Sequence, residues 1–142
     1  MGRREQREQI FKLVFMVEFN AAEEIPEQIA NYFENSQDAT EDEVLKPASE
    51  KDIKYISEKF ELIREKIPEI DSMINEQTSG WTTDRLGKVE LAIIRLAIYE
   101  MKYDDAVPVS VAINEAVELA KKFGQDEAPS FVNGVLAKFS KE

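Results

Sequence analysis

Apolar residues recur every three or four positions along nearly the whole chain, and no stretch shows a sustained alternation of apolar and polar residues. A spacing of three to four places side chains on one face of an α-helix, whereas a half-buried strand needs a spacing of two. The five Gly and five Pro residues fall mostly between the periodic stretches, where turns are expected. The pattern therefore predicts an all-α protein.

The periodic stretches predict about seven helices, with an acidic loop at 36–48. Ser49 is expected to be the N-cap of the third helix, with Asp52 three residues later. Pro68 is expected to end that helix and to begin the next, because a proline lacks the N–H that a helix interior uses. Gly124 is expected to close the sixth helix as its C′ residue. The approximate helix ranges are 3–20, 26–35, 49–67, 68–80, 83–103, 108–123 and 129–139.

The fifth predicted helix, from Thr82 or Thr83 to Tyr103, is apolar on nearly all sides. Such a helix is typically buried at the centre of a fold. Arg95 interrupts the apolar surface, and we expect it to form a buried structural ion pair. Glu90 stands near the helix start, where an acid interacts favourably with the helix dipole. A contact with a partner protein is the alternative interpretation of Glu90.

Composition narrows the class of protein. The chain has 142 residues, the size of one domain, and 43% of them are hydrophobic, so we expect a single globular domain over 1–142. The charged start is not a signal peptide, and no apolar run approaches the roughly 18 residues of a membrane span. The absence of Cys favours a reducing compartment. A soluble, cytoplasmic protein is therefore predicted.

The same composition argues against catalysis. The sequence contains no His, which is the commonest general base and metal ligand. It also contains no Cys, so thiolate metal sites are excluded. Without His, the Glu-x-x-His pairs of a di-iron bundle cannot form, and no calcium-loop or Gly-rich phosphate-binding motif is present. Most acids fall on polar helix faces or in the acidic loop. We therefore expect no enzymatic activity, no catalytic residue, no metal site and no cofactor.

Charge is unevenly distributed along the chain. The net charge is −11, which opposes loose binding to nucleic acid, yet Arg3, Arg4 and Arg7 gather at the start of the first helix. Three arginines there oppose the helix dipole, which suggests an anionic partner; a frayed, solvated terminus is the alternative. Lys121 and Lys122 end the sixth helix, where the dipole alone accounts for basic residues and an anion-binding role is equally open.

Two stretches, LGKVELAIIRLAIYEM at 86–101 and VPVSVAINEAVELAKKFGQDEAPSFVNGVLAKF at 107–139, closely resemble the C-terminal half of the bacterial transcription antitermination factors of the NusB family. The first helix, RREQREQIFKLVF, is similar to the family's start more loosely. The resemblance implies an all-α fold of two packed helical bundles. It also implies an RNA-binding adaptor that holds boxA RNA together with NusE, a small-subunit ribosomal protein, in antitermination complexes of RNA polymerase, notably on ribosomal RNA operons.

The resemblance assigns roles to individual residues. The family's arginine-rich helix carries RNA binding onto Arg3, Arg4 and Arg7, and the RNA surface is expected near Glu127 and Phe131. The charge of Lys121 and Lys122 adds them to the expected RNA-binding residues. Phe15 and Glu90 fall on positions that contact NusE in the family. Glu5 stands where another basic residue is expected, so weak RNA binding alone and tight binding with NusE are predicted. A homodimer through the RNA-binding face is possible in this family.

Two other functions compete with this interpretation. A NusB-like domain also precedes the catalytic domain of some RNA cytosine methyltransferases, so the chain could be an accessory to such an enzyme. It could also be a protein–protein interaction module in which Arg3, Arg4 and Arg7 take no part in function. Replacing Arg3, Arg4 and Arg7 by Ala separates the adaptor from the plain module, since only the adaptor depends on them.

Overall fold

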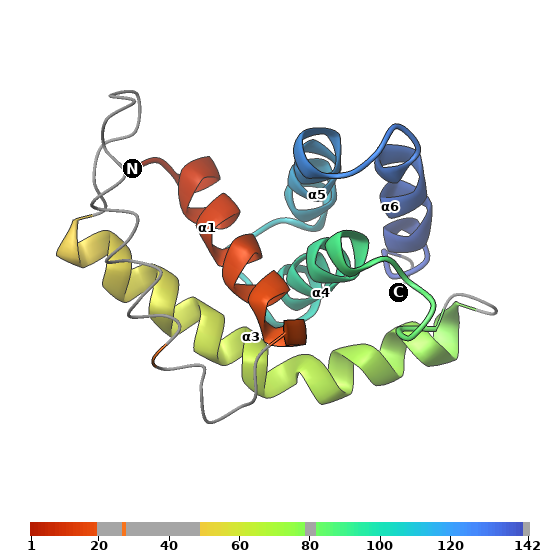
Figure 1. The fold of residues 1–142 in the computed structure, drawn as a ribbon, viewed down its shortest axis with the longest axis horizontal. Coiled ribbons are helices and arrows are strands. Elements are labelled where there is room, and N and C mark those ends of the chain that lie inside the picture. The colour runs from red at the N-terminus through yellow and green to blue at the C-terminus, as the bar shows by residue number, and fades with distance from the viewer. Residues whose placement is uncertain (20–26, 28–48, 79–81, 141–142) are drawn as a thin grey trace. The chain divides into compact units, whose positions relative to one another are not determined.

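The structure is a computed structural model that describes residues 1–19, 27, 49–78 and 82–140. These residues form five α-helices and one 3-10 helix, so the predicted all-α class is confirmed (Figure 1). The chain divides into two compact units, Met1–Leu62 and Ile63–Glu142. The predicted total of seven helices is not shown, because the helix expected at 26–35 and the loop expected at 36–48 lie, apart from Glu27, outside the described residues.

The first unit contains α1 (Arg3–Met16), the 3-10 helix η1 (Val17–Phe19) and the start of α3 (Glu50–Gln77). The inner face of α1 is fully covered through Ile10, Phe11, Leu13 and Val14, each at most 3% exposed. This burial supplies most of the stability of α1, since an isolated helix of 14 residues is marginal in water.

The helix α3 corrects one prediction. It runs without a break through Pro68, which was expected to separate two helices. A proline in a helix interior costs about 3 kcal/mol because one hydrogen bond is lost. On either side of exposed Pro68, however, Ile63, Ile70 and Ile74 are fully buried. Each buried isoleucine contributes about 1.5–3 kcal/mol. The continuous apolar stripe therefore outweighs the proline.

The helix α4 (Lys88–Tyr103) is the core of the second unit. Ten consecutive residues, Leu91 to Glu100, are buried, which confirms the prediction of a central helix. It packs against α5 (Val109–Phe123) and α6 (Ala128–Ala137), and these two also pack against each other (Figure 1). Arg95 confirms the predicted ion pair: its Nε lies 2.9 Å from Asp71 Oδ1 and its Nη2 lies 2.8 Å from Asp71 Oδ2.

The start of α4 was placed wrongly by the sequence pattern. Neither Thr82 nor Thr83 caps it, because the helix begins at Lys88 with Gly87 as the N-cap residue. The hydroxyl of Thr82 instead donates to the side chain of Asp84, within a turn closed by the hydrogen bond from Arg85 N–H to Thr82 O. Local side-chain bonds of this kind favour a turn over a helix.

Gly124 follows α5 as predicted, but for a different reason. Its backbone is extended, with φ −93° and ψ 179°, so the left-handed conformation of a C′ glycine is not used. A Cβ at this position would lie 2.5 Å from the Cβ of Ala128 and 2.9 Å from the carbonyl oxygen of Ala120. Glycine is therefore required by the close approach of α5 and α6.

Candidate nucleic-acid interface

The arginines at the start of α1 form the basic end of the first unit. Arg3 and Arg4 are exposed and Arg7 is half-buried. Residues three or four apart share a helix face, so Arg7 lies on the same side as both other arginines. The first turn contains one acid, Glu5, and its N-cap residue Gly2 makes no side-chain capping bond. This end of α1 can therefore present several guanidinium groups, which suit phosphate oxygens.

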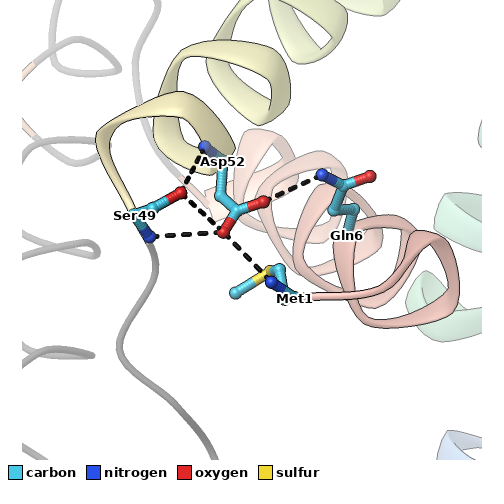
Figure 2. A network of polar contacts seen from close by, with 4 residues as sticks. All are labelled: Met1, Gln6, Ser49 and Asp52. Carbon is cyan, nitrogen blue, oxygen red and sulfur yellow. Dashed lines mark hydrogen bonds and ion pairs between the residues drawn. The ribbon is translucent and has the colours of Figure 1, made fainter.

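A polar network lies beside these arginines, and Asp52 is at its centre (Figure 2). Its Oδ1 accepts a hydrogen bond from Gln6 Nε2 at 3.0 Å, and its Oδ2 lies 3.2 Å from the ammonium group of Met1. Ser49 donates to Oδ2 from its hydroxyl at 2.9 Å and from its backbone N–H at 3.2 Å. The network connects the first turn of α1 with the first turn of α3.

The same contacts confirm Ser49 as the N-cap of α3. The N–H of Asp52 donates to Ser49 Oγ at 3.1 Å, and the Asp52 carboxylate accepts the Ser49 N–H in return. This reciprocal arrangement is a capping box with Asp in place of Glu. Hydrogen bonds from the Ser49 side chain and then from Gln6 lower the pKa of Asp52 to about 2, although burial acts in the opposite direction.

Phe15 lies near the end of α1 in a row of three aromatic rings. Its ring centroid is 6.4 Å from that of Phe11, which is buried, and 5.1 Å from that of Phe19, which is 62% exposed. Sequence reasoning singled out Phe15 and missed Phe19. The spacing of four residues between Phe11, Phe15 and Phe19 was the available signal. An exposed aromatic end of this kind is a usual feature of a protein interface.

The turn between α5 and α6 brings four predicted residues together in the second unit. Lys121 and Lys122 are exposed at the end of α5, and Glu127 is the N-cap residue of α6. Phe131 is half-buried one turn later, and its N–H donates to Glu127 O at 3.1 Å. Lys121 Nζ lies 3.4 Å from an oxygen of Glu118, in an exposed pair that contributes little to stability.

Glu90 occupies the third position of α4 and is half-buried. Its carboxylate folds back toward the N-cap residue Gly87. A Cβ added to Gly87 would lie only 2.5 Å from Glu90 Oε2. An acid in the first turn of a helix is favoured by the helix dipole. The fold thus accounts for Glu90 locally, and its contact with a partner stays a prediction.

The predicted residues therefore fall into separate groups. The three arginines stand at one end of α1 and Phe15 stands near the other, both in the first unit. In the second unit, the α5–α6 turn carries four residues, while Glu90 stands at the start of α4.

Among the described residues, no group of His, Asp or Glu could hold a metal ion, and no buried side-chain polar atom lacks a hydrogen-bond partner. In the same part of the chain, no helix is long and apolar enough to span a membrane.

Comparisons with known proteins agree with this architecture. The NusB family model matches residues 4–141. A transcription antitermination protein NusB from Agathobacter rectalis is 49% identical over 140 residues, covering 99% of this chain and 100% of that protein.

Among solved structures, NusB of T. maritima superposes with a TM-score of 0.78 at 30% identity, covering 100% of this chain and 92% of that one. A chain in a crystal structure of a plectonemic RNA supercoil superposes with a TM-score of 0.73 at 26% identity, covering 97% and 94% of the two chains. The chain belongs to the NusB family of transcription antitermination proteins, which are not enzymes.

Proposed function

We propose that this antitermination protein is an RNA-binding adaptor that holds boxA RNA jointly with NusE. The observation that carries the proposal is the group Arg3, Arg4 and Arg7, displayed at the start of α1 in a chain whose net charge is −11. Arginines in a first turn act against the helix dipole, so an anionic ligand offers a reason for them. A structurally similar chain in a crystal structure that contains an RNA supercoil supports RNA as that ligand.

The three arginines bind the sugar–phosphate backbone in this proposal. About three phosphate contacts give a salt slope near −2 for single-stranded RNA, which is small. The acidic remainder of the chain repels RNA at longer range. RNA binding by the isolated protein is therefore weak, and NusE supplies the additional affinity.

The α5–α6 turn provides a second RNA contact in the same proposal. Lys121 and Lys122 offer ammonium groups for phosphate, and Phe131 offers an aromatic ring on which an unpaired base can stack. Glu127 can accept hydrogen bonds from the exposed edge of a base. All four residues lie within two turns of the helix ends that meet there.

NusE contacts Phe15 and Glu90 in this proposal. Phe15 stands beside the exposed ring of Phe19, and burying such rings is favourable in an interface. Charge reversal by Glu90→Lys weakens NusE binding without unfolding the protein, as titration calorimetry with NusE can measure. Unchanged affinity would remove Glu90 from the interface.

The experiment that tests the function is fluorescence anisotropy with labelled boxA RNA, with and without NusE. We expect little binding by the protein alone in moderate salt and a stable ternary complex when NusE is present. If no ternary complex forms at any of the salt concentrations, the proposal is overturned. A pull-down that recovers an RNA methyltransferase in place of NusE would favour the accessory function.

We further propose that residues 1–142 act as one domain, which the match of a single family model to residues 4–141 supports. The adaptor works in the cytoplasm, where RNA polymerase assembles its antitermination complexes on ribosomal RNA operons. Self-association through the surface formed by Arg3, Arg4 and Arg7 would compete with RNA binding. Sedimentation with and without RNA measures this competition.

A further inference from the structure

The local sequence does not favour a helical conformation in the first turn of α1. Arg3, Arg4 and Arg7 place like charges three and four residues apart, which is unfavourable. They also stand at the positive end of the helix dipole. Gly2 offers no side-chain cap. A turn with these properties is expected to fray unless another part of the protein holds it.

Asp52 supplies the stabilising contacts that this turn lacks. It binds Gln6 Nε2 at 3.0 Å, between Arg4 and Arg7 in the sequence, and the ammonium group of Met1 at 3.2 Å, on the other side of Arg3. The carboxylate is itself fixed by Ser49, and the Asp52 side chain is 12% exposed. Figure 2 shows both oxygens engaged, one with Gln6 and the other with Ser49 and Met1. A negative charge therefore contacts the chain on both sides of Arg3 and Arg4, and directly before Arg7.

We propose that Asp52 is a positioning residue for RNA binding: it holds the first turn of α1 helical, so that Arg3, Arg4 and Arg7 meet the RNA backbone as an ordered set. This inference rests on the proposed RNA-binding function. Its physical basis is preorganisation, because a turn that is already ordered does not lose backbone entropy when RNA binds.

The sign of the effect separates positioning from simple electrostatics. Removing a carboxylate near the arginines reduces repulsion of the RNA phosphates, so charge alone predicts tighter binding by Asp52→Ala. Loss of positioning predicts weaker binding, because the frayed turn must be ordered again at the RNA. The two effects act in opposite directions on the same variant.

The test is anisotropy of labelled boxA RNA with saturating NusE, repeated at several salt concentrations. For Asp52→Ala we expect RNA binding about fivefold weaker or more, the equivalent of re-ordering about one residue. The salt slope is unchanged, because the arginines still reach the phosphates. Gln6→Ala breaks the same contact without changing the charge and is expected to weaken binding in the same direction.

Glu58→Ala is the matched control, since Glu58 is an exposed acid of the same helix, less than two turns from Asp52. It removes the same charge and leaves the network intact, so RNA binding stays within about twofold of the original protein. Amide hydrogen exchange adds a local readout. The backbone N–H of residue 6, which donates to Gly2 O at 2.9 Å, exchanges faster in both network variants and not in the control.

The inference is overturned if Asp52→Ala and Gln6→Ala bind RNA as tightly as the original protein. It is equally overturned if both variants weaken binding while the backbone N–H of residue 6 stays protected from exchange. The variant Arg3→Ala/Arg4→Ala/Arg7→Ala distinguishes failure of the proposed RNA binding by the arginines from failure of the positioning role of Asp52. If that variant binds RNA normally, the proposed role of the arginines fails; if it loses binding and the network variants do not, only the positioning role fails.

Discussion

Arginine is used in opposite ways in α4 and in the first turn of α1. Arg95 lies among buried apolar residues, its side chain is 6% exposed, and both of its bonds to Asp71 are shorter than 3 Å. Arg3 and Arg4 are exposed, and the network around Asp52 stabilises their turn through neighbouring residues. The comparison teaches that the surroundings of an arginine decide whether its guanidinium group is buried in an ion pair of the core or lies at the protein surface.

The largest effect is expected where the arginine is buried. Arg95→Met leaves the Asp71 carboxylate, which is 23% exposed, without its bidentate partner. Breaking such a pair costs about 3 kcal/mol of folding free energy. Urea denaturation measures this loss. The double variant Arg95→Met/Asp71→Leu should recover most of it, because the uncompensated charge is gone. If the single variant is as stable as the original, Arg95 is not a structural residue.

The arginines of α1 should show the reverse behaviour. Replacing Arg3, Arg4 and Arg7 by Ala is expected to cost about 1 kcal/mol of folding free energy or less, because Arg3 and Arg4 are exposed and Arg7 is half-buried. The affinity of the NusE-bound protein for boxA RNA should fall at least about tenfold at low salt, and the salt slope should decrease in magnitude by about 2. Anisotropy titrations and urea denaturation of the same preparation give both quantities. A large loss of stability with RNA affinity retained would reverse the assignment.

The ion pair of Arg95 could be predicted from local sequence, and the contacts between distant segments could not; the role of the α1 arginines stays a prediction. Apolar residues on nearly all sides made α4 recognisable in the sequence, and a single Arg among them implied an ion pair. Its partner Asp71 is 24 residues away, and Gln6 is 46 residues from Asp52, separations over which no periodic pattern carries information. Pro68 misled the prediction because propensity acts locally, whereas the burial of Ile63, Ile70 and Ile74 depends on the whole unit.

A smaller effect is expected at the N-cap of α3. Ser49→Ala removes the hydroxyl that accepts the Asp52 N–H and donates to the Asp52 carboxylate. Loss of such a cap costs about 1 kcal/mol of folding free energy. Ser49→Asp should restore part of the cap and place a second carboxylate beside Asp52, so it should remain less stable than the original. Thermal denaturation of the three proteins checks this order, and an Ala variant as stable as the original would contradict it.

The smallest expected effect is the contribution of the network around Asp52 to the pH dependence of folding stability. The pKa of Asp52 is lowered from 3.8 to about 2 in the folded protein, chiefly by Ser49 and then by Gln6. A depressed pKa means that the ionised carboxylate stabilises the fold fully above the pKa of the unfolded chain, and that this contribution is lost as the pH falls toward the folded value. The urea midpoints of the original protein and of Asp52→Asn should therefore differ by a constant amount near neutral pH and converge between about pH 4 and pH 2. Gln6→Ala, which keeps the carboxylate but removes one of its donors, should lie between them. A difference that stays constant down to pH 2 would show that the negative charge of Asp52 is not what distinguishes Asp from Asn at this position, and would contradict the prediction.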